Sequence, residues 1–113
     1  MKIAVIGSRN LQVDNLESYL PKDCTEIVSG GAEGIDTSAA QFAISRGIRL
    51  TKFLPQYSRY GKAAPIVRNK QIVDHSDLVL AFWDGKSAGT LSVIRYCEKI
   101  KKQCTVILLA SSI

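Results

Sequence analysis

The sequence predicts a three-layer α/β fold in which helices cover both faces of a five-stranded parallel sheet. Two observations support this prediction. Short runs rich in Val, Ile and Leu recur along the chain, and segments with helix-like spacing separate them. Strands that alternate with helices imply right-handed crossovers and therefore parallel pairing. The 113 residues suffice for one domain, so we expect residues 1–113 to form a single unit with strand order 3-2-1-4-5.

The predicted strands are almost continuous apolar runs, which are typical of strands buried on both faces of a sheet. They lie near residues 2–6, 25–29, 49–54, 77–83 and 104–109. Because both faces of such strands need cover, the intervening segments must supply apolar helix faces.

The helix predicted after the second strand is the most regular, and it stops at Gly47. Its apolar residues recur with helical spacing at Ile35, Ala39, Phe42 and Ala43. A similar stripe follows the fourth strand and comprises Thr90, Val93, Ile94, Cys97 and Ile100. Two shorter and less regular segments, 13–20 and 64–73, are also expected to be helical.

Closely spaced glycines stand between the second strand and its helix, in the run Gly30-Gly31-Ala32-Glu33-Gly34-Ile35-Asp36. Such a loop lets a ligand approach the backbone, because no Cβ atoms stand in the way. It also points free amides and the positive end of the helix dipole at the ligand. We therefore expect a phosphate or another anion here, and expect the substitution Gly31→Val to block it without disturbing the fold.

Two further loops are predicted to meet this one, because ligands of doubly wound sheets bind outside the carboxyl ends of the strands near the switch point. One loop spans residues 7–10 and the other spans 83–90. From the three loops we expect the ligand to contact Gly7, Ser8, Arg9, Ser29, Gly30, Gly31, Glu33, Gly34, Asp36, Trp83, Gly85, Lys86, Ser87, Gly89 and Thr90.

Among side chains, Arg9 and Arg68 are the strongest candidates for holding phosphate, because a guanidinium matches phosphate oxygens and stays charged. Asp36 has two open interpretations, as an acceptor for a ribose hydroxyl or as a helix cap. Thr90 contacts the phosphate or serves only for capping and packing. Ser29 is equally consistent with donating a hydroxyl and with packing alone.

The aromatic residues and the single histidine are weaker candidates. Trp83 ends a predicted strand, where an aromatic ring can stack on a base, but packing over the sheet is the favoured interpretation. Tyr57 and Tyr60 are balanced between stacking on a base or single strand and packing. His75 is expected to complement a helix dipole or to be a surface residue, rather than to be catalytic.

Several common functions are excluded by pattern. The first loop lacks Gly-x-Gly-x-x-Gly, and Leu80 stands where a P-loop needs its first glycine. The three cysteines form no Cys-x-x-Cys pair, so neither a disulfide framework nor a zinc site is expected, and we expect no metal or cofactor. No apolar stretch is long enough for a membrane span or signal peptide, so a cytoplasmic protein is expected.

Together the motifs resemble the SLOG superfamily of Rossmann-like domains. The resemblance rests on Gly7-Ser8-Arg9, the glycine run at 30–36, Arg68 before the fourth strand and Gly89-Thr90 after it. This superfamily includes the DNA-processing protein DprA (Smf), whose signature is similar to the glycine run, the LOG phosphoribohydrolases and small YpsA-like proteins. The resemblance spans nearly the whole chain and implies a nucleotide-like ligand. Because relatives commonly associate, it also implies a homo-oligomer.

The chain departs from the LOG pattern at one decisive position. LOG enzymes carry a glutamate three residues after the threonine of Gly-Thr, whereas this chain has Val93. Without that carboxylate, acid/base help in cleaving an N-glycosidic bond is missing. We therefore expect a nucleotide-binding sensor or adaptor. The alternatives are DprA-like binding of single-stranded DNA, which the net charge of +5 favours, and a LOG-like phosphoribohydrolase.

Overall fold

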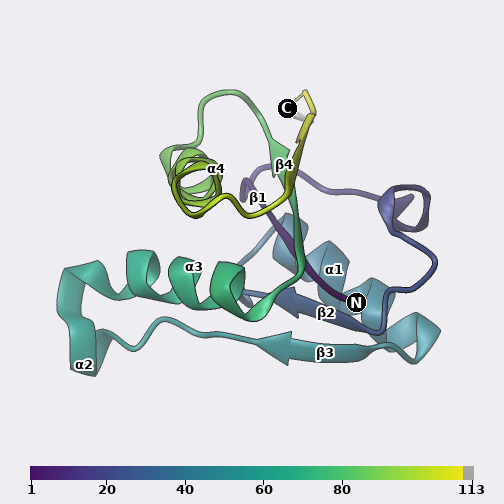
Figure 1. Cartoon of the computed structure of the whole chain (residues 1–113), viewed down its shortest axis with the longest axis horizontal. Helices are drawn as coiled ribbons and strands as arrows, with labels where there is room; N and C mark the ends of the chain where they lie inside the picture. The colour runs from purple at the N-terminus through teal and green to yellow at the C-terminus, as the bar shows by residue number, and fades with distance from the viewer. Residues whose placement is uncertain (111–113) are drawn as a thin grey trace.

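The computed structural model describes residues 1–110 of the chain (Figure 1). Its five strands form one parallel sheet in the order β3-β2-β1-β4-β5, which confirms the predicted fold class and strand order. The strands are β1 (Lys2–Gly7), β2 (Glu26–Ser29), β3 (Arg49–Lys52), β4 (Leu78–Trp83) and β5 (Cys104–Leu108).

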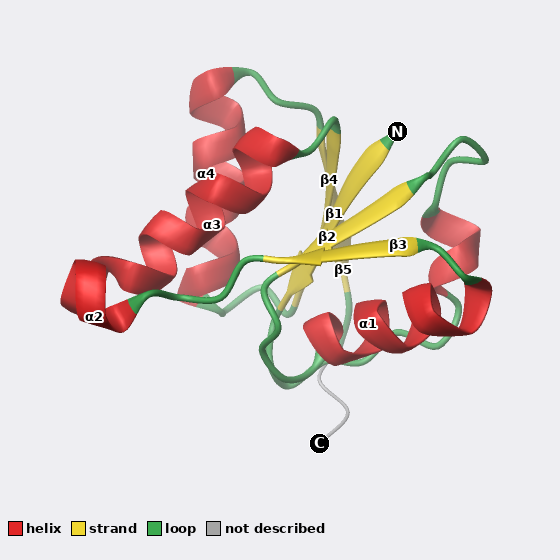
Figure 2. Cartoon of the chain, turned by 90° about the horizontal axis from the view of Figure 1, so that it is seen from below, coloured by secondary structure: helices red, strands yellow, loops and turns green. Residues whose placement is uncertain are grey.

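Three longer helices connect these strands, and they lie on both faces of the sheet (Figure 2). Helix α1 (Ile35–Arg46) covers one face, while α3 (Ala64–His75) and α4 (Ala88–Ile100) cover the other. The described residues also include three short elements, namely α2 (Tyr57–Tyr60), the 3-10 helix η1 (Leu16–Tyr19) and the 3-10 helix η2 (Gly61–Ala63). No helix within residues 1–110 combines the length and apolar character that crossing a membrane requires.

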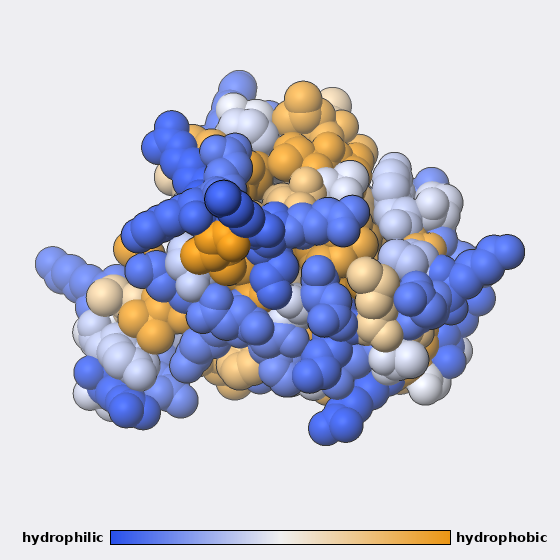
Figure 3. Space-filling model, in the orientation of Figure 1, coloured by the Kyte–Doolittle hydropathy of each residue, from blue (hydrophilic) through white to orange (hydrophobic). Residues whose placement is uncertain are grey.

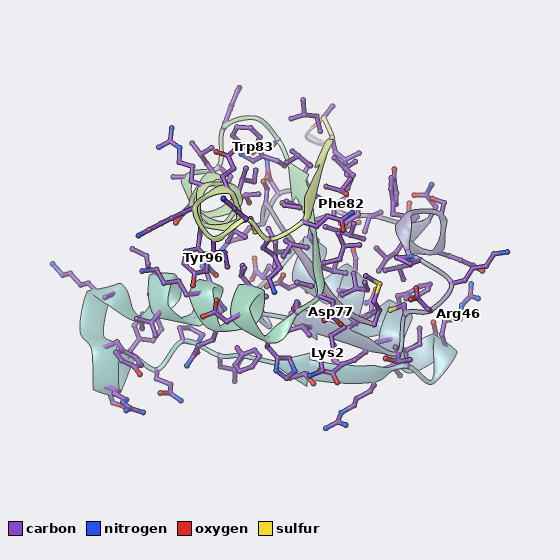
Figure 4. The ribbon with its side chains drawn as sticks, viewed as in Figure 1. Lys2, Arg46, Asp77, Phe82, Trp83 and Tyr96 are labelled. Atoms are coloured by element: carbon purple, nitrogen blue, oxygen red, sulfur yellow. The ribbon has the colours of Figure 1, made fainter. Side chains whose placement is uncertain are left out.

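Two apolar clusters hold the layers together, one on each face of the sheet. Along β1, Ile3 and Val5 belong to the cluster under α1, while Ala4 and Ile6 belong to the cluster under α3 and α4. This alternation follows from the period of two along a strand. Phe82 and Trp83 likewise point to opposite sides of β4 (Figure 4).

The outer strands differ from the predicted pattern. Strands β1, β2 and β4 are buried along most of their length, but β3 and β5 are only half-buried or exposed. Edge strands have a neighbour on one side only, so their apolar residues do not guarantee burial. On β5, Val106 and Leu108 are exposed, and apolar surface gathers over the upper part of the molecule in Figure 3.

The segment 13–20 is mostly irregular rather than the predicted helix, and only Leu16–Tyr19 forms a 3-10 turn. Tertiary contacts fix its path instead. The Val13 amide donates to the Ser38 hydroxyl, Leu16 is buried, and Tyr19 packs edge-on against Phe82 with ring centroids 5.2 Å apart. A short segment with an imperfect apolar stripe adopts whichever backbone places these anchors best.

Candidate functional site

A cavity of about 450 Å³ opens beside the carboxyl ends of β1 and β2, between α3 and the amino end of α4. Half of the predicted site residues line it. The first two loops and α1 supply Gly7, Arg9, Gly30 and Asp36. Helix α3 supplies Arg68, α4 supplies Gly89 and Thr90, and Ser87 lies just before α4. The topology therefore brings together residues that are more than 80 positions apart in the sequence.

The other predicted residues lie outside the lining of this cavity. They are Ser8, Ser29, Gly31, Glu33, Gly34, Trp83, Gly85 and Lys86. Ser8 and Ser29 are buried beneath it, whereas Glu33, Gly85 and Lys86 are exposed elsewhere on the loops. The three predicted loops therefore do meet at the cavity, but the sequence did not show which of their residues face it.

Two of the predicted glycines let the loops approach one another. A Cβ at Gly7 would lie 2.4 Å from the Phe82 carbonyl oxygen. A Cβ at Gly34 would lie 2.4 Å from the Arg9 carbonyl oxygen, and Gly34 also has a φ of 74°. Both contacts are with backbone, so neither position tolerates a side chain without a shift of the chain. Gly7 thus allows close packing against β4, and Gly34 allows the second loop to pack closely against the first.

The surroundings of Gly31 bear on the substitution predicted there. Its φ is 74°, and a Cβ there would lie 2.7 Å from Cδ2 of Leu54 rather than inside the cavity. The prediction that Gly31→Val would only block the ligand is therefore wrong, because this substitution would strain the loop. A substitution that blocks the ligand without straining the fold can be made at Gly89 instead, because Gly89 lines the cavity and has open space around its Cα.

One face of α3 forms a wall of the cavity. Pro65, Arg68, Asn69 and Ile72 all line it, and they follow the i, i+3, i+4, i+7 spacing of a helix face. Within this face, Arg68 Nη1 donates to the Gly30 carbonyl oxygen at 2.9 Å, and Nε donates to Asn69 Oδ1 at 2.9 Å. Arg68 is thus held in place while its guanidinium borders the cavity.

The absence of a side chain at Gly30 lets two charged side chains approach its backbone closely. A Cβ at Gly30 would lie 2.7 Å from Arg68 Nη1 and 3.0 Å from Asp36 Oδ2. Two side chains of opposite charge therefore flank the same backbone position. Sequence analysis missed Pro65 and Asn69. Pro65 stands three residues before Arg68 and Asn69 stands four residues after Pro65, and this spacing along the predicted helix is the signal that would have found them.

Asp36 is the second residue of α1, and the cap residue of this helix is Gly34. Its Oδ2 accepts a hydrogen bond from the Ala32 amide at 3.0 Å, so the carboxyl closes the glycine loop rather than capping the helix. Burial raises the pKa of Asp36 above its ordinary value, although the Ala32 hydrogen bond and the Arg68 charge act in the opposite direction. A buried carboxyl thus faces a cavity that two arginines also line.

The Ser29 hydroxyl lies near this carboxyl. It is fully buried, and its oxygen has no hydrogen-bond partner among residues 1–110. It is nevertheless close enough to Asp36 to help lower the pKa of that carboxyl.

The loop after β4 is closed by its own side chains. Asp84 Oδ1 accepts hydrogen bonds from the amides of Ser87 at 2.7 Å and Lys86 at 2.9 Å. These bonds hold the pKa of Asp84 below its ordinary value. The amides of Lys86 and Ser87 are therefore occupied by the protein itself, contrary to a loop whose amides all face a ligand.

Trp83 belongs to this closed loop. Its indole N–H donates to the Ser87 carbonyl oxygen at 3.0 Å, and its ring packs against the core cluster under α3 and α4. This position agrees with the favoured packing interpretation of Trp83. Its role is to anchor the turn that leads into α4.

The amino end of α4 remains open toward the cavity. Ser87 precedes the helix and makes no side-chain capping bond, and the first backbone bond within the helix runs from the Leu91 amide to the Ser87 carbonyl. The amides of Ala88, Gly89 and Thr90 therefore lack acceptors within the helix. Because Gly89 and Thr90 line the cavity, they place this positive end of the dipole beside it.

The remaining candidates lie away from the cavity lining. Tyr57 and Tyr60 form the short helix α2, where Tyr60 packs under the Arg59 guanidinium. His75 Nε2 lies 2.7 Å from Glu26 Oε2, so His75 pairs with a buried carboxylate at the opposite edge of the sheet rather than acting as a free surface residue. Within residues 1–110, no group of three His, Cys, Asp or Glu side chains is arranged to hold a metal ion.

Comparisons with protein-family models, with curated proteins and with solved structures gave no match to this chain. Its function is therefore inferred from the geometry of the cavity.

Proposed function

We propose that this chain binds a nucleotide or nucleotide-derived ligand in the cavity between α3 and α4. The observation that carries the proposal is the convergence of the open amino end of α4 with Arg9 and Arg68 around one cavity. Free amides at a helix end and guanidinium groups are the donors that phosphate oxygens prefer in proteins. A volume of about 450 Å³ lies within the range of small-ligand pockets.

The rest of the lining supports a ligand that is more than a phosphate. Ile6, Pro65, Ile72 and Val93 give the cavity an apolar side, against which a flat ring can lie. Asp36 supplies an acceptor for hydroxyl groups. A phosphate, a sugar and a base would each meet a matching surface. This combination also agrees with the resemblance to the SLOG superfamily, which we propose as the relationship of this chain.

The residues that line the cavity favour ligand binding over efficient catalysis. Val93 lines the cavity at the position where the LOG pattern has a glutamate. An apolar side chain there cannot exchange a proton with a substrate. We therefore propose a sensor or adaptor role, in which occupancy of the cavity is read by another molecule.

The test is a substitution that should spare the fold and abolish binding. Gly89→Glu places a carboxylate in the cavity at the second position of α4, where open space surrounds the Cα. A negative charge in the first turn complements the helix dipole, so the unfolding free energy should rise by about 1 kcal/mol. The same charge should lower affinity for a nucleoside monophosphate at least tenfold.

Ala88→Glu is the matched control, because Ala88 is exposed in the same turn but does not line the cavity. Calorimetric titration with nucleoside mono- and diphosphates, cyclic nucleotides, NAD and ADP-ribose gives the affinities. The proposal fails when no compound of this set binds the unmodified protein better than millimolar. It also fails when Gly89→Glu and Ala88→Glu bind equally well.

A further inference from the structure

The cavity contains one carboxyl in otherwise cationic surroundings. Asp36 is only 7% exposed, yet it lines the cavity together with Arg9 and Arg68. No other residue that lines the cavity carries a titratable side chain, as far as residues 1–110 show. Asp36 and Arg68 flank Gly30, within 3.0 and 2.7 Å of the same hypothetical Cβ position. An anion that approaches Arg68 must therefore also approach Asp36.

Asp36 retains capacity to accept hydrogen bonds. An ionised carboxylate has about four acceptor positions. The Ala32 amide occupies one of them, at 3.0 Å from Oδ2. The Ser29 hydroxyl and the Gly30 amide are also near enough to help lower the pKa of Asp36, but neither completes a well-formed hydrogen bond to it. A ligand that donates a hydrogen bond would therefore still find an acceptor position on this carboxylate.

Simple anions and hydroxylated anions meet this carboxylate differently. Sulfate at pH 7 brings only lone pairs, so it places like charges side by side in a poorly hydrated cavity. A sugar phosphate brings negative charge for the arginines and the α4 amides together with hydroxyl donors for Asp36. The sugar phosphate therefore pairs with the arginines and with Asp36, whereas sulfate pairs with the arginines but is repelled by Asp36.

We propose that Asp36 is a specificity-determining residue, which admits phosphate esters bearing free hydroxyl groups on their sugar and rejects simple anions and esters without those hydroxyls. This inference depends on the proposed nucleotide binding and names the ligand class as ribose phosphates. It assigns to Asp36 the exclusion of abundant inorganic anions from a site built to attract negative charge.

The protonation of Asp36 supports this assignment. Because burial raises the pKa of Asp36, its charge is removed at milder acidity than that of an exposed aspartate. The protonated carboxyl is a hydrogen-bond donor and no longer repels an anion. Discrimination against sulfate should therefore weaken as pH falls, while Arg9 and Arg68, which face the same space, stay charged.

The experiment compares three probe classes on the full chain by calorimetric titration at pH 7.5. They are the four ribonucleoside 5′-monophosphates, their 2′,3′-dideoxy counterparts and sulfate. The unmodified protein should bind its best ribonucleotide about tenfold more tightly than the dideoxy form, and sulfate least of all. Asp36→Asn should bind that ribonucleotide about tenfold less tightly and sulfate several-fold more tightly.

Asp14→Asn is the control for a general change of charge, because Asp14 is exposed and lies outside the cavity lining. It should leave the selectivity unchanged. Circular dichroism and thermal unfolding establish that each variant is folded. A second readout is sulfate affinity as the pH is lowered from about 7.5 to about 4, which should rise toward acid in the unmodified protein more than in Asp36→Asn.

The outcomes separate the two proposals. Equal ribonucleotide-to-dideoxy ratios in the unmodified protein and in Asp36→Asn would overturn the role of Asp36 while leaving nucleotide binding intact. Weaker binding of every probe by Asp36→Asn, sulfate included, would show that Asp36 only supports the loop, and would also overturn it. Absence of binding by the unmodified protein would instead refute the proposed function.

Discussion

At the residue scale, what a glycine does here depends on what a side chain in its place would meet. Gly7 and Gly89 both line the cavity and both were predicted as ligand contacts. At Gly7 a Cβ would meet the backbone oxygen of Phe82, whereas at Gly89 it would meet nothing within 4 Å. The fold therefore requires glycine at position 7, whereas a side chain at position 89 would not disturb the fold.

Alanine substitutions at these two glycines should therefore change stability in opposite directions. Gly7→Ala should lower the unfolding free energy by about 1–3 kcal/mol, because β4 must shift to relieve the contact. Gly89→Ala should raise it by about 0.5–1 kcal/mol, because alanine loses less conformational entropy in a helix. Urea denaturation of both variants measures the difference. Destabilisation of similar size in both would contradict this account of the two positions.

The aspartate shows how far residue-level interpretation reaches. From sequence, Asp36 was an acceptor for a hydroxyl or a helix cap, with no basis for choosing. Its hydrogen bond to the Ala32 amide, four residues back, belongs to neither interpretation. That bond closes the glycine loop and leaves the carboxyl facing the cavity.

At the scale of elements, α1 and α4 end in the same way with different residues. Each helix is followed by a residue in the left-handed conformation, Gly47 with φ 65° and Lys101 with φ 60°. In each, the next amide reaches back five residues, from Ile48 to Ala43 and from Lys102 to Cys97. This is the Schellman arrangement, in which glycine carries the least steric cost.

The steric cost of the left-handed conformation should disappear when Lys101 becomes glycine and appear when Gly47 becomes lysine. Lys101→Gly should raise the unfolding free energy by about 1 kcal/mol, and Gly47→Lys should lower it by a similar amount. Lys99→Gly, inside the last turn of α4, serves as control and should be destabilising by about 1 kcal/mol. Thermal and urea unfolding give the values. A loss of stability in Lys101→Gly would show that its side chain outweighs the backbone strain.

Elements also explain why the loop after β4 differs from its predicted role. The sequence offered glycine, lysine and serine amides for a phosphate. Asp84 takes the amides of Lys86 and Ser87 instead, because an aspartate readily accepts from amides two and three residues ahead. What remains for a ligand is the end of α4 beyond this turn.

At the scale of the whole molecule, two buried carboxyls lie at opposite edges of the sheet and have opposite linkage to pH. Asp36 follows the carboxyl end of β2, and Glu26 begins β2 at the other edge. Burial alone would raise the pKa of Glu26, but hydrogen bonds from His75 and Thr51 and the nearby charges of His75 and Arg49 hold it below its ordinary value.

The free energy of unfolding should therefore depend on pH in opposite directions through these two carboxyls. A lowered pKa means that Glu26 contributes stability above its unfolded pKa, and this contribution is lost as pH falls through its folded pKa. A raised pKa means that Asp36 favours the folded state below its unfolded pKa, and this is lost as pH rises through its folded pKa. From acid to neutral pH, the two groups therefore act against each other.

Single substitutions should separate these contributions. Between about pH 3 and 7, Asp36→Asn should gain more stability with rising pH than the unmodified protein, while Glu26→Gln should gain less. Urea midpoints across this range provide the measurement. Parallel curves for all three proteins would show that neither carboxyl differs between the folded and unfolded states.

The sequence by itself determined the strands, their parallel order and the neighbourhood of the candidate site. Apolar runs, helical spacing and glycine stops are local patterns, and short right-handed connections leave few ways to assemble them. Only the tertiary structure decided which loop residues face the cavity and that Asp84 closes its own loop. Side chains in a helix or strand point in directions that repeat along the sequence, but those in a loop do not. Their directions are fixed by contacts with residues distant in the sequence.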